Sequence, residues 1–145
     1  MQDLARFFAY LTGVIVVSMA IMLTSNRFLE FVSDPGWPGL ATLLAFGFLY
    51  LNLAYASIKR YIRKVPAPTN LHYVLALFIF LPPAIWILSL SNYTEGSELI
   101  LTLTLLFACG LGTFYGNRRG IRERYEFIQK LKAKQEAMRA AEKTD

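Results

Sequence analysis

The sequence predicts an all-α integral membrane protein, built as a four-helix bundle with a C-terminal cytoplasmic helical extension. Hydrophobic residues make up 55% of the 145 positions, and the mean hydropathy is +0.40, which is high for a soluble domain. Four apolar stretches contain no Asp, Glu, Lys or Arg. Their lengths fall within the range of about 17–25 residues that membrane-spanning helices use.

The first predicted span covers residues 7–24, and the second covers residues 39–58. A cleaved signal peptide is the alternative interpretation of the first stretch, but residues 1–6 lack the basic excess that such a peptide carries. Between the two spans lies a segment rich in Pro and Gly, residues 33–39. Pro38 suits the first turn of the second helix, where its missing N–H would be unpaired anyway.

The third predicted span, residues 71–90, contains two adjacent prolines, Pro82 and Pro83. Each proline removes a backbone hydrogen bond, so we expect a kink near the middle of the membrane and carbonyl groups that need other partners. The connection that follows, residues 91–98, is short. It therefore predicts that the third span and the fourth, residues 99–115, are antiparallel neighbours.

The spans define a membrane domain of residues 1–116, followed by a basic tail of residues 117–145. The tail is rich in helix-forming residues and should continue the fourth span as a helix. Four apolar residues recur at heptad-like spacing: Ile121, Ile128, Leu131 and Met138. Arg124 and Gln135 interrupt this face. A coiled-coil partner helix, an amphipathic helix on the inner leaflet and a solvated helix all fit the pattern.

The distribution of lysine and arginine predicts the orientation. The connection between the second and third spans is strongly basic, and nine further basic residues begin at Arg118. The opposite side carries only Arg27 against four acidic residues: Glu30, Asp34, Glu95 and Glu98. Because short cytoplasmic loops are enriched in Lys and Arg, both termini are expected in the cytoplasm. A bacterial inner membrane is the expected location.

The basic residues near the spans are expected to contact anionic lipid headgroups or a partner protein. This set is Lys59, Arg60, Arg63, Lys64, Arg118, Arg119, Arg122 and Arg124. Because the topology accounts for the net charge of +5, nucleic acid is not an expected partner. Aromatic residues are expected at both interfaces, as in other membrane proteins. Trp37 and Tyr93 should mark the outer one, and Tyr61, His72, Tyr73 and Tyr115 the inner one.

Small residues recur at every fourth position at the end of the fourth span, and they predict a smooth helix-packing face. They are Ala108, Gly112, Gly116 and Gly120. Such a face lets another helix backbone approach closely. It would pack either against the chain's own second or third span, the more common arrangement in bundles, or against a second copy or a partner subunit.

His72 and Cys109 are the only histidine and the only cysteine. One imidazole can ligate a haem or chlorin, but the chain offers no second histidine, so an interfacial role is expected for His72. A lone cysteine excludes an intramolecular disulfide and a thiolate zinc cluster. No cofactor is therefore predicted. A lipid between the helices is compatible with the pattern, and a pigment or quinone is left open.

The spans lack the side chains that most membrane chemistry requires. Proton-coupled transport normally uses an ionisable residue inside a span, and intramembrane catalysis needs a nucleophile with a base, paired acids or a metal cluster. We therefore expect a non-enzymatic accessory or scaffolding subunit of a larger membrane complex. A small homo-oligomeric transporter or pore and a membrane sensor are the alternatives.

Overall fold

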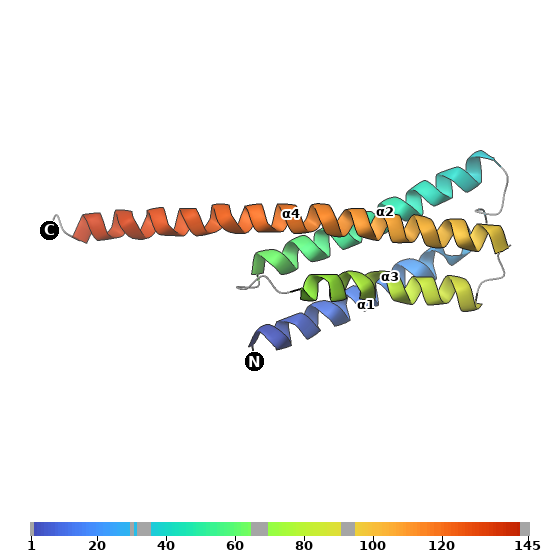
Figure 1. The fold of residues 1–145 in the computed structure, drawn as a ribbon, viewed down its shortest axis with the longest axis horizontal. Coiled ribbons are helices and arrows are strands. Elements are labelled where there is room, and N and C mark those ends of the chain that lie inside the picture. Colours follow the sequence, from blue (N-terminus) through green and yellow to red (C-terminus); the bar gives the residue numbers. More distant parts are fainter. Residues whose placement is uncertain (1, 30, 32–35, 65–69, 91–94, 143–145) are drawn as a thin grey trace.

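The computed structural model describes residues 2–29, 31, 36–64, 70–90 and 95–142. They form four helices: α1 (Gln2–Leu29), α2 (Trp37–Lys64), α3 (Leu71–Leu90) and α4 (Glu95–Glu142) (Figure 1). No strand occurs among these residues, and each helix contains an apolar segment long enough to cross a membrane. The predicted fold class, an all-α bundle of four membrane-spanning helices, is confirmed.

The helices are longer than the predicted spans because a helix need not end where its apolar segment ends. Pro38 lies in the first turn of α2, as predicted. α4 begins at Glu95, within the expected connection of residues 91–98. In its second turn, the hydroxyl of Thr102 donates a 2.8 Å hydrogen bond to the carbonyl oxygen of Glu98. An acidic residue in a first turn also favours helix formation through the helix dipole. Tyr93 lies outside the described residues.

The four helices are arranged so that α2 and α3 each contact the other three. α2 and α4 form the most extensive pair, whereas α1 and α4 do not meet within the described part of the chain. The start of α1 and the end of α4 lie on the same side of the bundle (Figure 1). We call this side the basic end, because α2 ends there with Arg63 and Lys64 in its last turn (Figure 1). α4 continues well beyond it as a single projecting helix (Figure 1).

The centre of the bundle contains a polar contact between three helices. The hydroxyl of Ser18 in α1 donates a 2.9 Å hydrogen bond to the carbonyl oxygen of Ile79 in α3. Ile79 lies four residues before Pro83, which has no N–H, so Ser18 supplies the donor that Pro83 lacks. The hydroxyl of Tyr50 in α2 donates to the carbonyl oxygen of Ser18 at 2.9 Å. Ser18, Tyr50 and Ile79 are fully buried.

This contact meets the expectation that a carbonyl freed by the proline pair finds another partner. α3 is a single helix through Pro82 and Pro83, and the kink at these residues stays a prediction. Large apolar side chains fill the surrounding core, among them Met22, Ile58, Leu75, Ile87, Leu101 and Leu105. The bundle therefore has a packed interior with its central hydroxyl groups hydrogen-bonded.

Candidate functional site

The small-residue face of α4 packs directly against α2 of the same chain. A Cβ atom added to Gly116 would lie 2.7 Å from the carbonyl oxygen of Tyr55, and one added to Gly120 would lie 2.9 Å from the Cβ of Ile62. A Cβ atom on Gly112 would overlap the carbonyl oxygen of Leu51. Only glycine permits this approach of the two backbones. Ala108, one turn earlier, is also buried.

These contacts show that α2 and α4 run parallel. Moving from Gly112 to Gly120 along α4 moves the contact from Leu51 to Ile62 along α2. Toward the other end of the bundle, a Cβ atom on Gly47 of α2 would lie 3.1 Å from the Cγ2 of Thr104. We call the contact between α2 and α4 at Gly47, Gly112, Gly116 and Gly120 the glycine seam. It occupies the predicted small-residue face within the chain.

At the basic end, the glycine seam continues into a cluster of charged side chains around Glu123. One carboxylate oxygen of Glu123 lies 2.8 Å from the Nζ of Lys59 and 3.1 Å from the Nε of Arg119. The other lies 3.7 Å from a guanidinium nitrogen of Arg63. The hydrogen bond from Lys59, together with the one from Arg119, lowers the pKa of Glu123. This cluster joins the end of α2 to the first turns of the predicted tail.

The residues of the predicted basic set lie in different surroundings. Lys59, Arg63 and Arg119 contact Glu123, and Arg122 pairs with Glu126 at 3.1 Å. The guanidinium of Arg118 lies 5.5 Å from the centre of the Phe114 ring. Arg60 and Lys64 are exposed, and Arg124 is half-buried. Contact of these residues with headgroups or a partner stays a prediction.

Beyond the charged cluster, α4 projects from the bundle with exposed apolar side chains. The boundary predicted between residues 116 and 117 falls within this continuous helix. Phe127, Leu131 and Met138 are 60%, 46% and 55% exposed. With ~3.6 residues per turn, they lie on the same side of the helix as Gly116 and Gly120. The side of α4 that faces α2 therefore carries an apolar stripe of Phe127, Leu131 and Met138 after α2 ends, with the exposed Lys130 and Lys134 beside it.

His72 lies in the first turn of α3, where it is 7% exposed and its ring centre is 4.0 Å from that of Tyr73. Within the described residues, no group of three or more His, Cys, Asp and Glu side chains is arranged to hold a metal ion. The interfacial role expected for His72 stays a prediction, and a ligand role stays its alternative.

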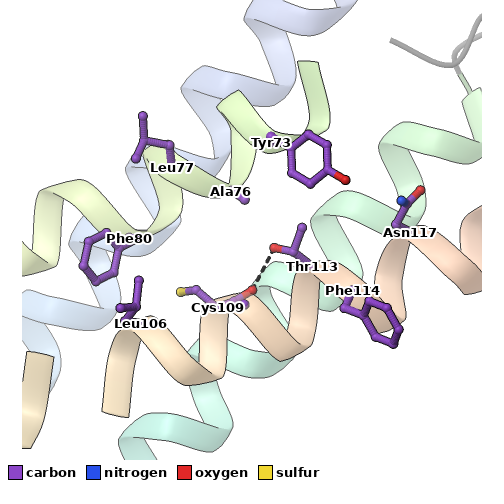
Figure 2. A pocket seen from close by; sticks show the side chains of 10 residues that line it. Tyr73, Ala76, Leu77, Phe80, Leu106, Cys109, Thr113, Phe114 and Asn117 are labelled. Atoms are coloured by element: carbon purple, nitrogen blue, oxygen red, sulfur yellow. Dashed lines mark hydrogen bonds between the residues drawn. The ribbon is translucent and has the colours of Figure 1, made fainter. Parts of the chain in front are cut away.

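A groove that the sequence analysis missed lies between α3 and α4 (Figure 2). Its volume is about 340 Å³. It is lined by four residues of α3 and six of α4: Tyr73, Ala76, Leu77 and Phe80, and Leu106, Cys109, Gly110, Thr113, Phe114 and Asn117. The hydroxyl of Thr113 donates to the carbonyl oxygen of Cys109 at 2.7 Å. Gly110 was the sequence signal for this groove, because it leaves a gap in the apolar run of residues 99–115 and does not belong to the series Ala108, Gly112, Gly116 and Gly120.

No protein-family model, curated protein or solved structure matches this chain in the comparisons. The function must therefore be inferred from the chain's own residues. Three features carry that inference: the glycine seam with its charged cluster, the apolar stripe of the projecting helix, and the groove between α3 and α4.

Substituting alanine for Gly116 should destabilise the protein. The added methyl group would overlap the Tyr55 backbone, and overpacking of this kind costs roughly 1–3 kcal/mol in the free energy of unfolding. Gly110→Ala is the matched control, because a Cβ atom there meets nothing within 4 Å, and it should be neutral or stabilise the helix by up to about 1 kcal/mol. Unfolding in mixed detergent micelles measures both. Equal destabilisation by the two variants would contradict the glycine seam.

Replacing Glu123 by glutamine should weaken the attachment of α4 to the end of α2 at neutral pH. Because the folded state lowers the pKa of Glu123, its charged form stabilises the fold above the ordinary Glu pKa, and this stabilisation is lost as the pH falls through the lowered value. The difference in unfolding free energy between wild type and Glu123→Gln should thus shrink as the pH falls below the ordinary Glu pKa of about 4.5 and vanish only below the lowered pKa of Glu123. Glu126→Gln, which removes an exposed pair with Arg122, should have the smaller effect at every pH.

Proposed function

We propose that this chain is a non-enzymatic accessory or scaffolding subunit of a larger membrane protein complex. In this proposal the four helices anchor it in the bilayer, and the projecting half of α4 contacts a partner protein. A subunit of this kind requires a stable membrane domain, a rigidly held extension and a surface that stays uncovered in the isolated chain. The following observations support each requirement.

The observation that carries the proposal is the continuity of one side of α4. Within the bundle, Gly116 and Gly120 on this side contact α2. Where α2 ends, the same side presents Phe127 beside Arg63 and Lys64, and beyond Lys64 it presents Leu131 and Met138 to the surroundings. These three residues extend over ~16 Å of helix. An apolar stripe of this length on a helix outside the membrane is typical of a surface that a second helix covers.

The charged cluster supports the proposal because it holds the base of the projecting helix. Glu123 connects α4 to Lys59 and Arg63 at the end of α2. The side chains of Lys59 and Glu123 are 26% and 19% exposed, whereas that of Arg63 is 49% exposed, so the pair with Lys59 is the less solvent-exposed of the two. A partner that binds the projecting helix would therefore be coupled to the orientation of the membrane bundle.

The spans supply little for transport or catalysis. None of the four predicted spans contains an Asp, Glu, Lys or Arg, which disfavours proton-coupled transport. The central hydroxyl groups of Ser18 and Tyr50 are hydrogen-bonded to α1 and α3 backbone carbonyls. These features favour a packing subunit over the transporter or pore.

Changing the apolar stripe should release the partner without unfolding the bundle. We expect the double variant Phe127→Ser with Leu131→Ser to lose most of the protein that co-purifies with the wild-type chain in fixed stoichiometry from its native membrane. The matched control is Ala133→Ser with Ala137→Ser, which changes two exposed residues on another face of the same helix. Quantitative mass spectrometry of the purified complexes measures the outcome. Purification of the wild-type chain as a homo-oligomer alone would contradict the proposal and favour the pore.

The proposal includes a bacterial inner membrane with both termini in the cytoplasm, supported by the excess of Lys and Arg at the basic end. Single cysteines introduced at Gly96 and Ala137, with Cys109→Ala as background, test the orientation. Both positions are exposed and lie toward opposite ends of α4. A membrane-impermeant maleimide should label Gly96→Cys in intact cells and Ala137→Cys only after permeabilisation. The reverse pattern would place the basic end outside.

A further inference from the structure

The groove between α3 and α4 has the form of a site for a long, narrow apolar molecule. Along α4 it runs from Leu106 to Asn117, which is eleven residues or ~16 Å of helix. Half of a hydrocarbon core measures ~15 Å. Asn117 and Tyr73 lie at the end of the groove near the basic end, and Leu106 and Phe80 lie at the deep end (Figure 2). The groove therefore matches the depth of one bilayer leaflet.

The walls of the groove are open to the bilayer rather than enclosed in the bundle. Leu77, Leu106 and Phe114, which line it, are 50%, 53% and 55% exposed. A Cβ atom added to Gly110 in the groove would meet nothing within 4 Å. A lipid chain can thus enter sideways from the membrane, without any opening of the helices.

The end of the groove near the basic end is polar. The side-chain oxygen of Asn117 is buried and accepts no hydrogen bond from the described residues. A buried acceptor without a donor is costly, so a ligand would be favoured that supplies a hydroxyl or an N–H to this oxygen once the amide turns toward the groove. The guanidinium of Arg118 lies beside this end, 5.5 Å from the ring centre of Phe114 in the groove wall. Arginine binds phosphate oxygens through several N–H donors.

We propose that this groove binds one phospholipid of the leaflet at the basic end, through an acyl chain along α3 and α4. Its headgroup is anionic and carries a free hydroxyl, as in phosphatidylglycerol. The phosphate lies at Arg118, and a headgroup hydroxyl donates to the side-chain oxygen of Asn117. The groove has the depth of one leaflet, the cation is Arg118, and the acceptor without a donor is the side-chain oxygen of Asn117. Together they fit phosphatidylglycerol better than phosphatidylcholine, which is zwitterionic and has no hydrogen-bond donor in its headgroup. The inference rests on the membrane fold and is independent of the proposed partner protein.

The test is native mass spectrometry of the full-length chain, titrated with phosphatidylglycerol or with phosphatidylcholine of the same acyl chains. We expect the wild type to bind one phosphatidylglycerol in preference to phosphatidylcholine. Gly110→Leu should weaken that binding by at least about tenfold, since its side chain would fill the groove and exclude the acyl chain. Arg118→Gln should weaken phosphatidylglycerol binding by about fivefold and leave phosphatidylcholine binding unchanged. Asn117→Leu should also reduce the preference for phosphatidylglycerol over phosphatidylcholine.

The matched control for the groove is Gly13→Leu in α1. Gly13, like Gly110, has open space where a Cβ atom would lie, but it lines a separate groove between α1 and α2. This variant should bind phosphatidylglycerol as the wild type does. Equal affinity for the two lipids, or equal binding by the Gly110→Leu and Gly13→Leu variants, would overturn the proposal. Co-purification of an isoprenoid quinone or a partner helix that Gly110→Leu displaces would also overturn it, by identifying another occupant.

Discussion

The close approach of the α2 and α4 backbones is the constraint on which the rest of the structure depends. Between two membrane helices there is little hydrophobic driving force, because lipid chains are as apolar as leucine. Association must come from dispersion contacts and hydrogen bonds, and both weaken quickly with distance. At Gly112, Gly116 and Gly120 the absence of a Cβ atom lets the backbones touch. The two parallel helices thereby form a rigid pair to which α1 and α3 are added.

The position of the seam also determines what the rest of α4 can do. Because Gly120 and Glu123 still contact α2, the first turns of the predicted tail belong to the bundle and hold the projecting helix in a defined direction. With one side of α4 occupied by α2, the side toward α3 carries the groove that ends at Asn117. One long helix therefore contributes to the membrane core, to the proposed lipid site and to the proposed partner surface.

The proline pair in α3 illustrates how a local defect is accommodated by the tertiary structure. Pro83 removes the donor that the carbonyl of Ile79 would have had, and in a bilayer no water replaces it. Ser18 satisfies this carbonyl from α1, while Tyr50 of α2 contacts Ser18. The contact links α1 and α2 to α3, and the hydroxyl groups of Ser18 and Tyr50 both donate hydrogen bonds to backbone carbonyl groups within it.

The sequence by itself determined the fold class, the four spans and the helical character of the tail, because apolar length and helix propensity are local properties. It also identified the glycine spacing and the need for a partner near the prolines. Only the tertiary structure decided that α2 covers those glycines, that Ser18 is the donor, and that Gly110 and Asn117 line a groove. These facts depend on which helices are neighbours and how each is rotated. In a membrane every span has an apolar exterior, so hydrophobic periodicity cannot distinguish the side of a helix that faces lipid from the side that faces another helix.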